Sequence, residues 1–63
     1  MQTARIDRSN WREAVEHSGI SLARLAPLTG VSVAAIYAYS RGARKTPPEW
    51  LRRLEEVLRE RAA

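Results

Sequence analysis

Apolar residues recur along the first part of this chain at intervals of three and four positions, the spacing of one helix face. Trp11, Ala14 and Val15 form the first such group, and a glycine follows shortly after it. Asp7 or Ser9 supplies an N-cap, because a side-chain oxygen at that position accepts a hydrogen bond from a free N–H group of the first turn. The pattern therefore predicts a helix from one of these two residues to about residue 18.

A second helix is predicted to begin after Ser21, whose hydroxyl suits an N-cap, and to end near Leu28. Its buried face is expected to consist of Leu22, Leu25, Ala26 and Leu28. Pro27 lies beyond the first turn, so it removes one main-chain hydrogen bond of the helix. The helix is therefore expected to be short and slightly kinked.

A third helix over residues 33–40 is predicted after Ser32, a further N-cap residue. Gly30 lies in the turn between the second and third helices, where we expect a positive φ angle. The core face of the third helix is predicted to consist of Ala35, Ile36 and Tyr39. The outward face is predicted to consist of Val33, Ala34, Tyr37, Ala38 and Arg41.

The fourth helix has a strong start signal, Thr46-Pro47-Pro48-Glu49. Thr46 fits the N-cap, Pro47 the first helical position, and Glu49 completes a capping box. An apolar stripe follows, made up of Trp50, Leu51, Leu54, Val57 and Leu58. The stripe is wider than one small neighbouring helix needs, which suggests a second contact surface. The whole pattern predicts one all-α domain of four helices over residues 1–63.

Charge is distributed unevenly along the chain. No acidic residue occurs between Glu16 and Glu49, and four basic residues lie in that interval: Arg24, Arg41, Arg44 and Lys45. The other basic residues are balanced by the seven acidic residues, so the net charge of +4 belongs to the central segment. Such a focused positive charge favours a polyanionic partner. On charge alone, a solvated surface is an equally good interpretation.

Composition excludes several classes of function. The chain has no Cys and one His, so we expect no disulfide, no metal and no cofactor. It has no apolar run of membrane-spanning length and no signal-peptide pattern, so no membrane role and a cytoplasmic location are expected. No catalytic triad, phosphate-binding glycine loop or isolated pair of carboxylates is recognisable. The expectation is therefore a non-enzyme without a small-molecule ligand.

The segment from Ser21 to Gly42 reads S-x-x-x-L-A-x-x-T-G-V-S-x-x-x-I-x-x-Y-x-x-G. This pattern resembles the Cro and lambda-repressor-like (XRE-type) helix-turn-helix family, in particular small phage-type regulators. The physical reasons agree with the resemblance, since a small Ala26 allows close helix crossing, Gly30 forms the sharp turn, and Ile36 pins the third helix to the core. The resemblance implies a compact four-helix domain whose third helix enters the major groove of double-stranded DNA.

Transferred by position, the family's base-contacting residues correspond to Ser32, Val33, Ala34, Tyr37, Ala38 and Arg41. Contacts to DNA phosphates are expected from Arg24, Arg44 and Lys45. Two features depart from the family pattern: Leu22 stands where a polar residue, often Gln, commonly binds phosphate, and the recognition face lacks Gln and Asn. Part of the specificity is then expected to come from DNA shape. Arg5 is a weaker candidate for a contact in the minor groove.

The resemblance implies a sequence-specific transcription regulator, a Cro-type repressor that binds a palindromic operator as a homodimer. Pairing is expected to use some subset of Leu51, Leu54, Val57 and Leu58 on the wide apolar stripe. Two alternatives remain open at this stage. One is an antitoxin-like protein-interaction module on the same fold, and the other is a DNA-bending recombination factor.

Overall fold

Serine hydroxyls start the two central helices, as the sequence predicts. In the computed structural model, which describes residues 6–62 and the side chains of residues 6–61, Ser21 Oγ accepts a hydrogen bond of 3.2 Å from the N–H of Arg24. Ser32 Oγ accepts one of 3.1 Å from the N–H of Ala35. The four helices of the described chain are α1 (Trp11–Ser18), α2 (Leu22–Thr29), α3 (Val33–Arg41) and α4 (Pro48–Ala62). Arg5 lies outside the described residues.

The helix α1 begins later than predicted, because residues 7–10 form a turn of their own before it. Asp7 Oδ1 accepts hydrogen bonds from the main-chain N–H groups of Ser9 and Asn10, at 2.9 and 3.1 Å. In return, Asn10 Oδ1 accepts a bond of 2.8 Å from the N–H of Asp7. Asp7 therefore caps the turn that leads into the helix, while the helix itself starts at Trp11.

Helix α4 also begins one position later than predicted. Pro48, and not Pro47, is its first residue. The carbonyl of Pro47 accepts the first helical hydrogen bond, 3.1 Å from the N–H of Leu51. Since a proline at the first helical position loses no hydrogen bond, Pro48 suits this place.

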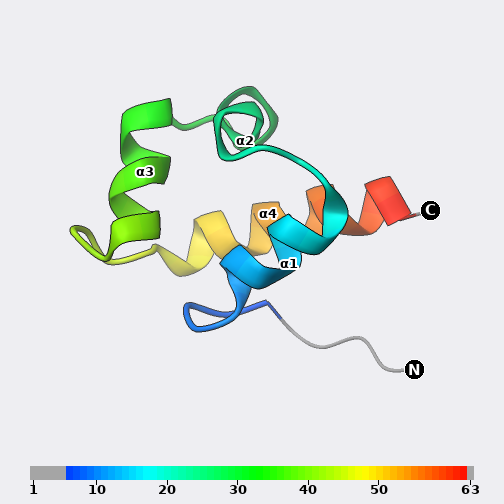
Figure 1. Ribbon diagram of the computed structural model, residues 1–63, viewed down its shortest axis with the longest axis horizontal. Coiled ribbons are helices and arrows are strands. Elements are labelled where there is room, and N and C mark those ends of the chain that lie inside the picture. The colour runs from blue at the N-terminus through cyan, green and yellow to red at the C-terminus, as the bar shows by residue number, and fades with distance from the viewer. Residues whose placement is uncertain (1–5, 63) are drawn as a thin grey trace.

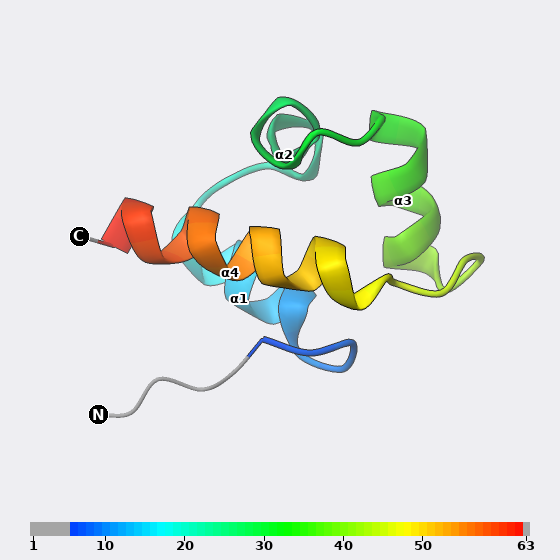
Figure 2. The same ribbon diagram turned by 180° about the vertical axis from the view of Figure 1, so that it is seen from behind.

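The four helices pack around one core, in which α2 contacts α3 and α4, and α1 contacts α4. Figures 1 and 2 show α4 running along the molecule, with α3 standing across it near its N-terminal end and α2 lying above it. The residues of the buried apolar cluster come from all four helices and, for Ile20, from the connection between α1 and α2: Trp11, Val15, Ile20, Leu25, Ala26, Ala35, Ile36, Tyr39, Trp50, Leu51 and Leu54. The predicted core face of α3 is thus confirmed.

Trp50 lies at the centre of this core. Its ring meets Trp11 edge-on, with centroids 4.9 Å apart, and is tilted against Tyr39 at 5.2 Å. Its indole Nε1 donates a hydrogen bond of 2.8 Å to Oγ1 of Thr29. Aromatic packing of this kind contributes stability beyond that of the area it buries. Through these contacts Trp50, in α4, joins α1, α2 and α3.

Two expectations about leucines are wrong. Leu28, predicted to be buried, is 45% exposed. Leu51 and Leu54, predicted to pair two copies of the chain, are 9% and 0% exposed because they fill the core of a single copy. The other two residues of that predicted interface, Val57 and Leu58, are half-buried against the same core. Most of the apolar stripe on α4 is therefore used within the monomer.

None of the helices in the described part of the chain has the length and apolar character needed to cross a membrane.

Candidate nucleic-acid interface

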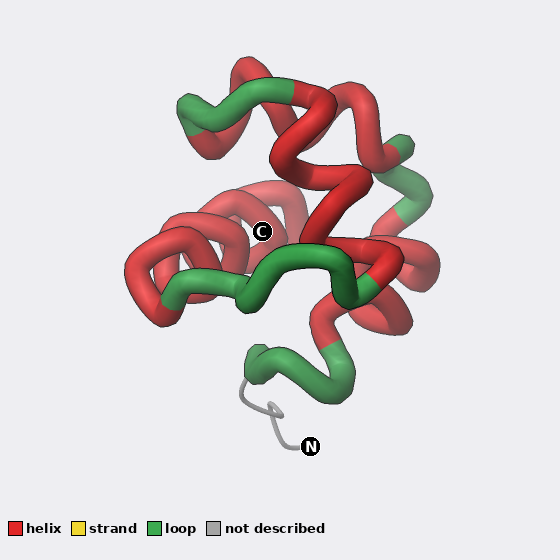
Figure 3. The backbone as a smooth tube through the Cα atoms, turned by 90° about the vertical axis from the view of Figure 1, so that its left-hand side faces the viewer, coloured by secondary structure: helices red, strands yellow, loops and turns green. Residues whose placement is uncertain are grey.

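The exposed face of α3 carries most of the predicted recognition residues. Val33 and Tyr37 are 38% and 41% exposed, and they lie on the same face of the helix. Ser32, Ala34 and Arg41 are exposed beside them. Figure 3 views the molecule from the side on which α3 lies, and no other helix covers α3 in that view. Five of the six predicted base-contacting residues thus share one open surface, called the α3 face below.

Ala38 is the exception, because it is buried at 8% exposure and does not belong to the α3 face. The loop after α3 folds back onto the last turn of the helix. There the carbonyl of Ala38 accepts hydrogen bonds from the N–H groups of Ala43 and Arg44, at 2.9 and 3.3 Å. Ala38 lies at the border between the two faces of the helix, and its side chain is not accessible from the α3 face. The prediction that Ala38 contacts a base is therefore wrong.

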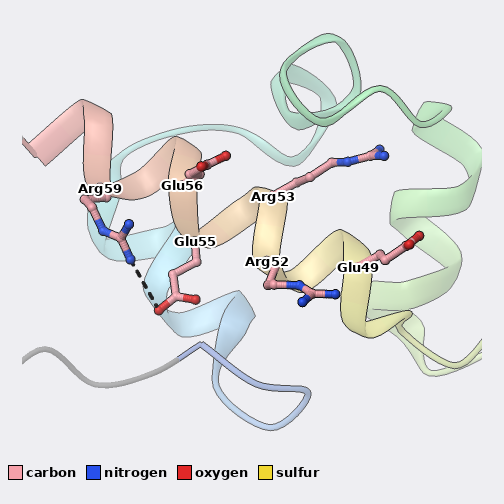
Figure 4. Close-up of a pocket in the computed structure, with 6 residues that line it drawn as sticks. All are labelled: Glu49, Arg52, Arg53, Glu55, Glu56 and Arg59. Carbon is pink, nitrogen blue, oxygen red and sulfur yellow. Dashed lines mark ion pairs between the residues drawn. The ribbon is translucent and has the colours of Figure 1, made fainter.

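The turn between α2 and α3 is fixed from outside by α4. Gly30 has a φ angle of +82°, as predicted for this turn. Arg53 reaches from α4 toward the turn (Figure 4), and its Nη1 donates a hydrogen bond of 3.1 Å to the carbonyl of Thr29. A cation at the C-terminal end of a helix also interacts favourably with the helix dipole. Arg53 thus helps to set the angle between the two central helices, a role that its place in the sequence does not indicate.

Basic side chains gather at the C-terminal end of α3. A hollow there is lined by Arg8, Arg12, Tyr39, Arg41, Gly42, Arg44, Lys45 and Thr46. We call its five cationic residues the basic corner: Arg8, Arg12, Arg41, Arg44 and Lys45. No Asp or Glu is among the residues that line the hollow. In Figure 3 the loop over residues 42–47 crosses this side of the molecule from α3 to α4, above the turn that precedes α1.

Two of these cations, Arg8 and Arg12, are not among the sequence predictions. Each is close in sequence to an acidic residue, so the charge pattern gives no signal for either. The fold brings both to the end of α3. Arg8 Nε donates to the carbonyl of Thr46 at 3.3 Å, and Arg12 Nη1 donates to the carbonyl of Ser40 at 2.6 Å.

The predicted phosphate-contacting residues divide into two groups. Arg44 and Lys45 belong to the basic corner, where the guanidinium carbon of Arg44 lies 5.9 Å from the centre of the Tyr39 ring. Arg24 lies elsewhere, in a hollow beside the start of α2 with Arg61 and Leu28 among its neighbours. The structure thus does not bring Arg24 into the basic corner.

The described residues include no group of three or more His, Cys, Asp or Glu side chains that could hold a metal ion. The pKa of Asp7 is lowered chiefly by the hydrogen bond from the Ser9 side chain. That carboxylate serves the turn before α1. The arrangement is suited to contacting a polyanion over an open surface.

Comparison of the chain with models of known protein families, with curated proteins and with solved structures gave no match.

Proposed function

We propose that this chain is a sequence-specific double-stranded DNA-binding transcription regulator, with α3 as its recognition helix. The observation that carries the proposal is the α3 face itself. It is an open helix surface with two exposed apolar side chains, Val33 and Tyr37, next to a hollow lined by five cations. The major groove of B-DNA admits one α-helix, and flanking phosphates attract cations beside it.

The side chains of the α3 face suit particular partners in the groove. Val33 and Ala34 offer methyl groups, which pack against the C5-methyl group of thymine. The hydroxyl of Ser32 accepts the capping bond from Ala35 and retains its own O–H as a donor. Tyr37 donates or accepts through its phenol. Arg41, in the last turn of α3, matches either guanine or a phosphate.

The regulator is proposed to bind a palindromic operator as a homodimer and to act as a repressor of the Cro type by covering a promoter. One α3 face spans only a few base pairs, so two copies on half-sites about 34 Å apart extend the readout. With Leu51 and Leu54 in the monomer core, only Val57 and Leu58 remain from the predicted pairing surface. Pairing is therefore proposed to be weak in free solution and to strengthen on DNA.

Selection of binding sites from a random duplex library, followed by footprinting on the selected site, tests this proposal. The expected result is a palindromic consensus with two protected half-sites. Measurement of molecular mass with and without that duplex then shows whether pairing depends on DNA. Failure to protect any site at low salt contradicts the proposal. A stable complex with another protein and no DNA binding supports an antitoxin-like module, and strong bending in circular-permutation gel shifts supports a recombination factor.

A further inference from the structure

The basic corner differs in charge composition from the exposed surface of α4. Along the exposed side of α4, three arginines are interspersed with three glutamates (Figure 4): Glu49, Arg52, Arg53, Glu55, Glu56 and Arg59. Charges of opposite sign balance there, and Arg59 pairs with Glu55 at 3.8 Å. The basic corner has five cations and no acid among its lining residues. Like charges gathered in this way repel one another, and a bound anion relieves the repulsion.

Main-chain carbonyls hold the guanidinium groups of Arg8 and Arg12 at this hollow. Each of the two makes one such bond, to Thr46 and Ser40 respectively. A guanidinium has five N–H donors in a planar fork. The bonds to the carbonyls therefore leave further donors on each group, while they fix its position beside the end of α3. A fixed planar fork is the geometry that phosphate oxygens bind best.

We infer that Arg8 and Arg12 bind the DNA phosphate backbone, so that the DNA-contacting surface extends from the helix-turn-helix onto α1 and the turn before it. This inference rests on the proposed function and assigns two contacts that the sequence does not predict. The α3 face occupies the groove, and the basic corner, at the C-terminal end of α3, lies against the strand that borders the groove. Arg8 and Arg12 then contact phosphates on the side of the corner formed by the N-terminal part of the domain.

The salt dependence of DNA binding tests the inference, because each neutralised phosphate adds about 0.9 to the slope of log affinity against log salt. The double variant Arg8→Gln, Arg12→Gln is expected to have a slope shallower by about 1.8 on the selected duplex. Between 50 and 200 mM salt, the wild type is therefore expected to lose about 12-fold more affinity than the double variant. The matched control is Arg52→Gln, Arg59→Gln, which removes the same charge from α4 and is expected to keep the wild-type slope.

A charge-retaining variant separates phosphate binding from bracing of the loop. Arg8→Lys, Arg12→Lys keeps both charges but lacks the planar fork, so its slope is expected to return close to that of the wild type. A purely structural role for the two arginines predicts that the lysine variant remains impaired. Circular dichroism on each variant reports whether the four helices are retained.

Nuclear magnetic resonance of the wild-type chain gives a readout that needs no substitution. The Nε–H signals of Arg8 and Arg12 are expected to shift when the duplex is added, while those of Arg52 and Arg59 remain in place. Unshifted signals, together with equal slopes for the glutamine variant and its control, overturn the inference while leaving the proposed function intact. A wild-type chain that binds no duplex at low salt overturns the proposed function and the inference together.

Discussion

Trp50 in α4 and Thr29 at the end of α2 are joined by a buried hydrogen bond of 2.8 Å between Nε1 and Oγ1. The Thr29 hydroxyl in turn donates to the carbonyl of Leu25 at 2.7 Å. Both side chains are almost fully buried, at 2% and 3% exposure. A single hydroxyl thus satisfies the indole N–H and closes the last turn of α2, immediately before the turn that leads to α3.

Replacement of Thr29 by valine tests this relationship, because valine keeps the shape and removes the hydroxyl. The variant leaves the indole N–H of Trp50 buried without its acceptor, which costs about 1–3 kcal/mol of unfolding free energy. Urea denaturation followed by circular dichroism measures the loss. The control Thr29→Ser keeps the hydroxyl and loses one methyl group, worth about 0.8 kcal/mol. A valine variant as stable as the wild type contradicts the prediction.

Two leucines of very different burial form a second test. Leu54 is 0% exposed and Leu28 is 45% exposed. Leu54→Ala opens a cavity in the core and is expected to cost about 2–5 kcal/mol, enough to unfold much of so small a domain. Leu28→Ala is expected to change stability by no more than about 0.5 kcal/mol. Thermal melts compare the two variants, and equal losses contradict the assignment of Leu54 to the core of one copy.

The turn before α1 gives a pH-dependent prediction. Hydrogen bonds from Ser9 lower the pKa of Asp7, so its folded-state pKa lies below the unfolded value of about 3.9. The carboxylate therefore stabilises the fold fully above the unfolded value, and this contribution is lost as the pH falls through the folded value. A carboxyl titration followed by nuclear magnetic resonance is expected to show the lowered pKa. The Ser9→Ala variant is expected to raise it, and an unchanged pKa in that variant contradicts the stated cause.

Substitutions on the α3 face are expected to change sequence preference. Val33→Ala removes two methyl groups and Tyr37→Phe removes one hydroxyl. Each is expected to lower affinity for the selected site by about tenfold or less while leaving binding to scrambled duplex unchanged. Competition between the two duplexes measures this difference. The control Arg44→Gln removes a proposed phosphate contact and is expected to weaken binding to both duplexes alike. An unchanged preference after both α3 substitutions argues against α3 as the reading helix.

The parts of the fold that the sequence predicts well depend on neighbouring residues. The caps of Ser21 and Ser32 are examples, since each hydroxyl bonds to an N–H only three residues ahead. The core face of α3 is similarly local, because Ile36 and Tyr39 follow from helical spacing. The late start of α1 is a partial exception. The reciprocal bonds of Asp7 and Asn10 form a turn there that the spacing of apolar residues does not indicate.

The sequence does not predict, or predicts wrongly, the features that depend on contacts between segments far apart in the chain. Ala38 is buried beside a loop that folds back to bond its carbonyl, and Leu54 is buried where α4 packs against α1 and α2. The partner of Thr29 lies 21 residues away along the chain. The basic corner illustrates the same limit, since Arg8 and Thr46 are 38 residues apart in sequence. Charge counted along the chain indicates Arg41, Arg44 and Lys45, and only the fold adds Arg8 and Arg12 to them.

Helix α1 packs against α4, and Figure 1 shows both helices below α2. The core is complete only when the last helix has docked, since α4 supplies Trp50 and Leu54 to it. An excised α2–α3 pair, without α4, is therefore not a folding unit. Any lesion that detaches α4 is therefore expected to disrupt the α3 face as well. The fold and the proposed recognition surface are then expected to be lost in one cooperative step.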